Sequence, residues 1–187
     1  MSQEPKASRR DAGAPEASRV LLFTGDGKGK TTAALGMALR ACGHGLRVLV
    51  VQFIKAAPTG ELAAMRYLPG FELVQAGRGF LPKPGSPQFE EHRRAAAAGL
   101  VQADLALASG RYELVILDEI CGAVVAGLLS EDDVAALVGK RPPALTMVLT
   151  GRGATPRLLA LADTVTEMRC IKHAFSTGRK AQKGVEF

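Results

Sequence analysis

The chain has 187 residues, of which 47% are hydrophobic and 22% are charged. This length and composition favour one domain with a buried core and argue against a disordered chain. No window approaches the roughly 18 uninterrupted apolar residues of a membrane span. The first residues also lack the charged-then-apolar pattern of a secretory signal. We therefore expect a cytoplasmic protein without a membrane partner.

The three cysteines, Cys42, Cys121 and Cys170, are far apart in the sequence. Their odd number makes a disulfide framework improbable, and their spacing is not that of metal ligands. We interpret them as buried or incidental thiols.

The formal net charge of +6 is unevenly distributed, because residues 169–187 contain five Lys or Arg and a single Glu. Such a basic tail can bind nucleic acid, or it can line a pocket for a small polyanion. Apart from Phe175, the tail lacks the interleaved aromatic residues that stack on bases. We therefore favour the small polyanion and expect no nucleic-acid partner.

Residues 1–18 have no apolar periodicity and are rich in Ala, Ser, Pro, Glu and Arg, which predicts a flexible N-terminal extension. Residues 19–187 alternate short apolar runs with amphipathic stretches, and we expect them to form a single domain. In chain order, the pattern predicts strand 20–23, helix 30–41, strand 48–53, helix 61–67, strand 71–74, helix 88–108, strand 114–117, helix 131–138, strand 145–149, helix 156–161 and strand 164–168.

The strands are near-continuous in Val, Leu and Ile, which indicates burial on both faces, as in a parallel sheet. Ser130, followed by three acidic residues, is a plausible N-cap for helix 131–138. Strands that alternate with helices predict an α/β fold with a doubly wound, mainly parallel sheet flanked by helices. Ligands of such sheets bind at the carboxyl ends of the strands.

A glycine-rich loop lies between the first strand and the first helix, which is the context of a P-loop. Its glycines let backbone N–H groups approach phosphate oxygens, and the helix N-terminus favours the same anion. Lys30 would supply a positive charge, and the Thr31 hydroxyl could bind Mg²⁺. The nucleotide-binding residues that we predict are Thr24, Gly25, Asp26, Gly27, Lys28, Gly29, Lys30, Thr31 and Thr32.

The spacing of this loop departs from the usual pattern of Gly, four residues and Gly-Lys-Thr. Counting back from Gly29 places Thr24 at the first-glycine position, and counting from Gly25 leaves three intervening residues. We therefore do not expect the ordinary geometry at the γ-phosphate.

Two further strand ends carry candidate residues. The run 114–117 is followed by Asp118 and Glu119, which resembles a Walker-B segment in which a carboxylate holds Mg²⁺. Either of the two carboxylates could approach the metal. Arg152, after strand 145–149, could reach bound phosphate. No base positioned to activate a hydroxyl acceptor, as a kinase requires, is apparent.

In its motifs, the chain resembles the ATP:corrinoid adenosyltransferases of the CobA type. The resemblance covers essentially everything after Arg19. It rests on the variant loop and on an ordered set of motifs at residues 43–45, 51–55, 60–61, 117–119, 150–153, 161–165, 172–175 and 180–187.

The resemblance implies a RecA-like P-loop fold and transfer of the 5′-deoxyadenosyl group from ATP to Co(I) of a corrinoid, with triphosphate released. It also implies Mg²⁺, a homodimer, a low-potential electron donor such as a flavoprotein reductase, and ATP bound with its γ-phosphate deepest in the loop. It assigns Lys30 and Lys28 to the phosphates, Thr31 with an acid from Asp118-Glu119 to Mg²⁺, and Arg152 to charge support.

The resemblance further implies that aromatic residues cover the lower face of the corrinoid and so ease the reduction of Co(II). Phe80 matches the first of these residues, and a core or loop-anchoring role is its alternative. Pro82 stands where the family typically has Trp, and the chain contains no Trp. The extension 1–18 is also shorter than in familiar members, in which it covers the partner's active site.

Two other functions fit parts of the pattern. An ordinary P-loop ATPase or kinase would act at the γ-phosphate of ATP. A non-enzymatic nucleotide- or nucleic-acid-binding module would account for the basic tail, and its affinity for DNA or RNA would depend steeply on salt.

Overall fold

The computed structural model describes residues 18–174 and 178–185. Six parallel strands form one sheet in the order β3-β2-β4-β5-β1-β6. The strands are β1 (Val20–Thr24), β2 (Val48–Gln52), β3 (Phe71–Gln75), β4 (Leu114–Asp118), β5 (Thr146–Thr150) and β6 (Thr164–Glu167). The expected α/β class with a parallel sheet is confirmed, and the expected extension 1–18 lies, except for Ser18, outside the described residues.

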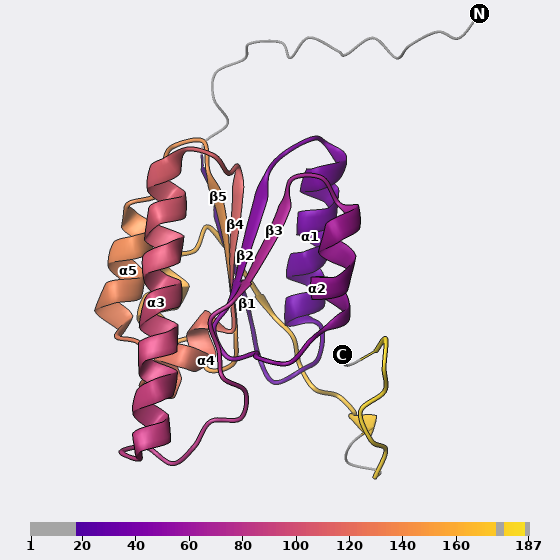
Figure 1. Cartoon of the computed structure of the whole chain (residues 1–187), viewed down its shortest axis with the longest axis vertical. Helices are drawn as coiled ribbons and strands as arrows, with labels where there is room; N and C mark the ends of the chain where they lie inside the picture. The colour runs from indigo at the N-terminus through magenta and orange to yellow at the C-terminus, as the bar shows by residue number, and fades with distance from the viewer. Residues whose placement is uncertain (1–17, 175–177, 186–187) are drawn as a thin grey trace, which may run out of the picture.

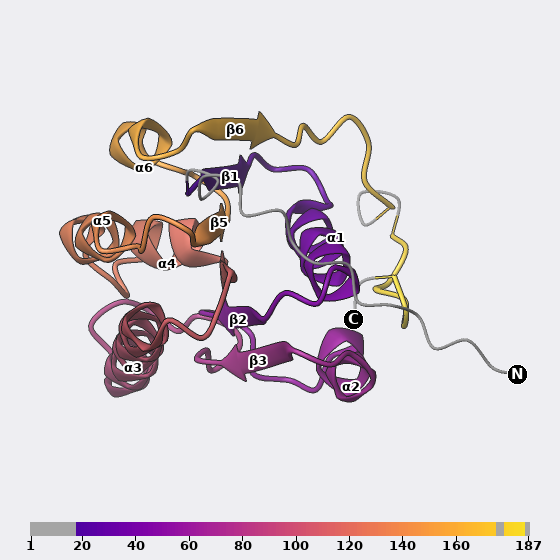
Figure 2. The ribbon, with the colours of Figure 1, turned by 90° about the horizontal axis from the view of Figure 1, so that it is seen from above.

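Helices cover both faces of the sheet (Figures 1 and 2). On one face lie α1 (Lys30–Gly43) and α2 (Gly60–Ala64), which continues as the 3-10 turn Met65–Tyr67. On the other face lie α3 (Pro87–Ser109), α4 (Ile120–Val125), α5 (Glu131–Gly139) and α6 (Pro156–Ala160). Within the described residues, no helix combines the length and the apolar character needed to cross a membrane.

Alternate residues of the buried strands supply two separate cores. In β2, Leu49 and Val51 belong to the core beneath α3, α4 and α5, whereas Val48 and Val50 belong to the core beneath α1 and α2. All five residues of β2 and all five of β4 are buried, because helices cover both of their faces. The apolar runs in the sequence therefore predicted the strands correctly.

The predicted elements agree with the structure to within a few residues, with one omission. Helix α4 was not predicted, because it is six residues long and directly follows the acidic pair at the end of β4. Ser130 is the N-cap of α5 as expected, since its hydroxyl accepts a hydrogen bond from the Asp133 N–H at 3.0 Å. Cys42, Cys121 and Cys170 are all free thiols, and burial raises the pKa of Cys121 to about 12.

Candidate active site

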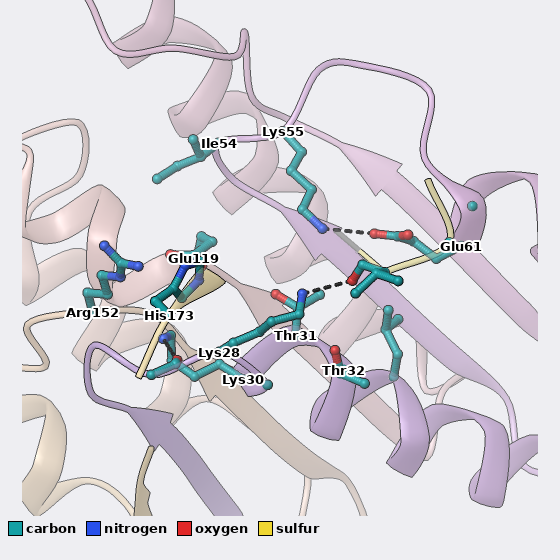
Figure 3. A pocket seen from close by; sticks show the side chains of 16 residues that line it. Lys28, Lys30, Thr31, Thr32, Ile54, Lys55, Glu61, Glu119, Arg152 and His173 are labelled. Carbon is teal, nitrogen blue, oxygen red and sulfur yellow. Dashed lines mark hydrogen bonds and ion pairs between the residues drawn. The ribbon is translucent and has the colours of Figure 1, made fainter. Parts of the chain in front are cut away.

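A cavity of ≈ 720 Å³ lies at the carboxyl ends of the strands, where the glycine-rich loop meets α1. Figure 3 shows the lining side chains, which come from the glycine-rich loop and α1, from the chain after β2 and the start of α2, from the ends of β4 and β5, and from the chain after β6. Its walls combine cations, carboxylates and main-chain groups, which suits a charged ligand. The lining residues are Gly27, Lys28, Gly29, Lys30, Thr31, Thr32, Leu35, Ile54, Lys55, Gly60, Glu61, Glu119, Arg152, His173, Gly184 and Val185.

Lys30, the first residue of α1, is only 6% exposed. Its ammonium group donates hydrogen bonds to the carbonyl oxygens of Gly25 at 2.7 Å and Gly27 at 2.8 Å, so it is held against the loop. Burial lowers the pKa of Lys30, an effect that the carboxylate of Glu119 partly offsets and that Arg152 reinforces. The loop therefore holds a largely buried cation in the wall of the cavity.

The N-terminus of α1 differs from those of α2, α3, α5 and α6. Serine hydroxyls cap α3 and α5, and threonine hydroxyls cap α2 and α6, each accepting from a first-turn N–H. Helix α1 starts from Gly29, has no side-chain cap and has no acidic residue in its first turn. Its positive end is therefore directed at the cavity with its first N–H groups not capped by a side chain, an arrangement in which helices bind phosphate.

Asp118 ends β4 and is completely buried. Its Oδ1 accepts hydrogen bonds from the hydroxyls of Thr31 at 2.8 Å and Thr150 at 2.7 Å, and its Oδ2 accepts one from the amide of Gln52 at 3.1 Å. Gln52 and Asp118 are also register partners on neighbouring strands. Asp118 therefore fixes the Thr31 hydroxyl relative to the sheet and does not line the cavity itself.

Glu119 is the carboxylate of this pair that lines the cavity. Its backbone has φ 62°, the single positive value among the described non-glycine residues, and its N–H donates to the Thr150 hydroxyl at 2.9 Å. Such a conformation costs roughly 1–3 kcal/mol and is concentrated at functional sites. Burial and the neighbouring Asp118 raise the pKa of Glu119, whereas Lys30 and Arg152 lower it.

The oxygen atoms around Thr31 suit the coordination of a magnesium ion. Thr31 and Glu119 supply a hydroxyl and a carboxylate to one cavity, and Asp118 orients that hydroxyl. These are hard oxygen ligands, and Mg²⁺ typically uses one or two protein groups together with substrate phosphates. Within the described part of the chain, no group of three or more His, Cys, Asp or Glu could hold a metal alone. The site therefore suits a metal that arrives with a polyphosphate.

Lys55 and Glu61, which both line the cavity, form an ion pair with 2.8 Å between Nζ and Oε1 (Figure 3). The amide of Gln52 lies 3.4 Å from the same Glu61 oxygen, which links the pair to the Asp118 network. The hydrogen bonds from Lys55 and Gln52 lower the pKa of Glu61 although burial opposes them. Glu61 is therefore held as an anion beside the cation.

A second, mainly apolar cavity of ≈ 480 Å³ adjoins the first and shares Ile54 and Lys55 with it. The loop after β3 forms part of its wall. The Gly79 N–H donates to the Ile54 carbonyl at 2.9 Å, which fixes this loop to the end of β2. Phe80, next in the chain, lines the cavity and is fully exposed. A large aromatic side chain is thus held in the open beside the charged cavity, and it is not part of the core.

The chain segment that follows β6 packs on the glycine-rich loop. The Gly27 N–H donates to the Met168 carbonyl at 2.7 Å, and the Met168 N–H donates to the Thr24 carbonyl at 2.8 Å. A Cβ added at Gly27 would lie 2.7 Å from the carbonyl oxygens of both Met168 and Arg169. Gly27 is therefore required for the close approach of two main chains.

We expect Gly27→Ala to lower the free energy of unfolding by about 1–3 kcal/mol, because the methyl group overlaps the main chain of residues 168–169. Gly36→Ala is the matched control, since a Cβ there meets nothing within 4 Å in the middle of α1. That control should be neutral or stabilising by up to about 1 kcal/mol. Urea unfolding of both variants measures the difference, and equal stabilities would show that the contact has no cost.

Comparison with known proteins identifies the family. A family model described as ATP:corrinoid adenosyltransferase BtuR/CobO/CobP matches residues 16–187. The chain belongs to the ATP:corrinoid adenosyltransferase family. A corrinoid adenosyltransferase of Pseudomonas aeruginosa is 47% identical over 172 residues, which cover 90% of this chain and 83% of that protein. Corrinoid adenosyltransferases of Escherichia coli K12 and Salmonella typhimurium, the latter named CobA, are 42% and 41% identical, each over 90% of this chain and 85% of its own length.

The fold of this adenosyltransferase brings most of the residues predicted from the sequence together. Residues 27–32, Glu119 and Arg152 line the larger cavity, and Phe80 lines the smaller one. Thr24, Gly25, Asp26 and Asp118 do not line either cavity. Gly25 binds Lys30 through its carbonyl, the Thr24 hydroxyl accepts from the Ala154 N–H at 3.4 Å, and Asp118 lies behind Thr31.

Sequence reasoning assigned no role in the site to Gln52, Lys55, Glu61 or Thr150. A signal was present for Gln52 and Thr150, because each is a polar residue at the carboxyl end of an otherwise apolar strand. Both are completely buried, and both donate to Asp118. Lys55 and Glu61 belong to family-like motifs but occupy loop and short-helix positions that carry no periodic signal.

Proposed function

We propose that the protein transfers the 5′-deoxyadenosyl group of ATP to Co(I) of a corrinoid and releases inorganic triphosphate. The observation that carries this proposal is the junction of two unlike cavities at Ile54 and Lys55. One cavity has the loop, cations and helix end that suit a polyphosphate, and the other is apolar with an exposed aromatic side chain. Membership of the adenosyltransferase family gives these cavities their substrates.

The reaction requires little proton transfer. Co(I) supplies both electrons of the new Co–C5′ bond, and the C5′–O bond breaks with its electron pair leaving on triphosphate. The protein must therefore hold C5′ against cobalt and stabilise negative charge on the departing triphosphate. Lys28 and Lys30 are proposed to bind the phosphates, with Arg152 adding positive charge. All three line the same cavity.

Thr31 and Glu119 would hold Mg²⁺ together with the phosphate oxygens, and Asp118 would orient Thr31. A bound Mg²⁺ neutralises part of the polyphosphate charge.

We further propose a cytoplasmic homodimer served by a low-potential electron donor such as a flavoprotein reductase, and no nucleic-acid partner. Analytical ultracentrifugation tests the dimer.

Phe80 is proposed to cover the lower face of the corrinoid and to ease reduction of Co(II). We expect Phe80→Ala to slow turnover from cob(II)alamin about tenfold and to slow reaction with chemically pre-reduced Co(I) by less than twofold. Phe80 packs on no core cluster, so the variant should unfold at the wild-type temperature. Equal losses with the two cobalt states would remove Phe80 from the reduction step.

The products of ATP separate this reaction from an ordinary P-loop ATPase or kinase. The protein is incubated with MgATP and a reduced corrinoid, and the products are resolved by chromatography and by the cobalt absorption spectrum. Triphosphate in equal amount to adenosylated corrinoid supports the proposal. ADP with orthophosphate or a phosphorylated acceptor, and cobalt left unalkylated, would reject it.

A further inference from the structure

The chain beyond β6, the yellow part of the trace in Figures 1 and 2, runs back beside α1, and some of its residues line the larger cavity. We use "C-terminal segment" for residues 168–174 and 178–185. One end of it is hydrogen-bonded to the glycine-rich loop through Met168 and Gly27. Near the other end, the Lys28 ammonium donates to the Val185 carbonyl at 2.8 Å, 157 positions away in sequence. The same loop therefore anchors the segment at two points.

Between and at these anchors, the segment contributes three residues to the cavity wall, His173, Gly184 and Val185. His173 is half-buried and lies in the same cavity as Lys28, Lys30 and Arg152 (Figure 3). By contrast, the lysines and arginines of the described segment are exposed and are absent from the lining. The segment thus presents an imidazole and main chain to the ligand, whereas its basic side chains face solvent.

An imidazole in this position suits a polyphosphate. It can donate a hydrogen bond through a ring N–H in either the neutral or the protonated form. Lys28 has three N–H donors, so it can keep the Val185 carbonyl and still donate to a phosphate oxygen. The ammonium group would then link the segment to the ligand.

We propose that the C-terminal segment is the outer wall of the triphosphate site, with His173 as a phosphate-binding residue and Lys28 joining Val185 to the bound phosphate. The inference rests on the proposed function in one respect, which is that the bound ligand is the triphosphate part of ATP. In the reaction, this wall adds a donor to the leaving group and keeps water from it.

Binding of inorganic tripolyphosphate with Mg²⁺, measured by isothermal titration calorimetry, tests the role of His173. His173→Ala should weaken the affinity about tenfold, the loss expected for one hydrogen bond to a charged group. Lys172→Ala is the matched control, because it removes a full charge from the neighbouring exposed position outside the cavity lining, and it should change the affinity less than twofold. A loss below threefold in His173→Ala, or an equal loss in Lys172→Ala, would overturn the proposal.

A second measurement uses the unaltered protein and therefore does not depend on a variant that folds. Trypsin can cut after Arg169, Lys172, Arg179, Lys180 and Lys183, all of which are exposed. If ligand holds the segment in place, magnesium tripolyphosphate should slow these cuts at least fivefold and leave cleavage after Arg111, before β4, unchanged. Cutting in the segment at the same rate with and without tripolyphosphate would also overturn the proposal.

Both measurements use magnesium tripolyphosphate, without a corrinoid or an adenosyl group, so they do not depend on the proposed reaction. A protein that yields no adenosylated corrinoid would disprove the proposed reaction and leave the tripolyphosphate results standing. Normal adenosylation with no effect of His173→Ala on tripolyphosphate would instead disprove the role of the C-terminal segment alone.

Discussion

Lys30→Ala is expected to lower kcat/KM for ATP by about a thousandfold, which corresponds to about 4 kcal/mol of transition-state stabilisation. The reason is the position of the ammonium group. It lies in the wall of the cavity, almost completely buried, at the start of a helix that has no side-chain cap. A cation held in such a buried position interacts strongly with the charge that develops on departing triphosphate.

The variant should remain folded, which separates lost catalysis from lost structure. Burial lowers the pKa of Lys30, so its charge is disfavoured in the folded protein, and removing that charge relieves part of the cost. The carbonyls of Gly25 and Gly27 lose their hydrogen-bond donor in the variant, and this loss lowers the free energy of unfolding. Lys140→Ala is the control, because Lys140 is a surface residue paired with Asp104, and its rates should stay within twofold. Near wild-type rates in Lys30→Ala would refute the assignment of the loop.

The sequence predicted the sheet well because burial on both faces leaves an unambiguous pattern. Val48 to Val51 face two different cores in alternation, and such a strand must be apolar throughout. The glycine-rich loop was equally visible, since its position between a strand and a helix constrains its conformation. The ends of the strands were predicted only to within a residue or two. Leu145, for example, was predicted to begin a strand because it is apolar; it is buried, but β5 begins at the next residue.

The sequence could not separate the roles of Asp118 and Glu119, because they are adjacent acids after the same strand. Their separation is a tertiary effect. Asp118 continues the strand and binds its neighbours Gln52 and Thr150, whereas the positive φ of Glu119 turns the chain and exposes its carboxylate to the cavity. No local pattern encodes a positive φ at a glutamate.

The function of individual glycines also depends on distant residues. Loop glycines are usually interpreted through phosphate binding alone. In this chain, Gly25 and Gly27 both face the main chain of Met168, where an added Cβ would lie within 3 Å. The unusual spacing of the loop therefore accommodates the segment after β6, which lies more than 140 positions away and which the sequence could not place.

The acidic pair gives the second large expected effect. Asp118→Ala should lower the free energy of unfolding by about 3 kcal/mol, because it leaves Thr31, Thr150 and Gln52 without their buried acceptor. For a domain of this size, such a loss lowers Tm by roughly 6–12 °C. Turnover should fall with it, since the Thr31 hydroxyl is no longer fixed.

Glu119→Gln should have the opposite effect on stability and a similar effect on activity. We expect kcat/KM for MgATP to fall about a hundredfold, because the amide removes the charged ligand proposed for Mg²⁺. The ionised form of Glu119 is disfavoured in the folded protein, as its raised pKa indicates. At neutral pH, without nucleotide or metal, the variant should therefore unfold at a temperature equal to or above that of the wild type.

The sign of the pH effect follows from the same shift. A raised pKa in the folded state means that ionisation of Glu119 destabilises the fold above that pKa and that protonation removes this cost as the pH falls. The stability advantage of Glu119→Gln should accordingly be largest at neutral pH and should shrink as the pH falls through the raised pKa of Glu119. Thermal unfolding of both proteins over this pH range measures the difference in stability.

If Glu119→Gln were as unstable as Asp118→Ala, or if its advantage grew at low pH, the two carboxylates would not have the separate roles assigned to them. A strained, desolvated glutamate in the cavity wall would then be structural, and the binding of Mg²⁺ would have to depend on Thr31 and the phosphates alone.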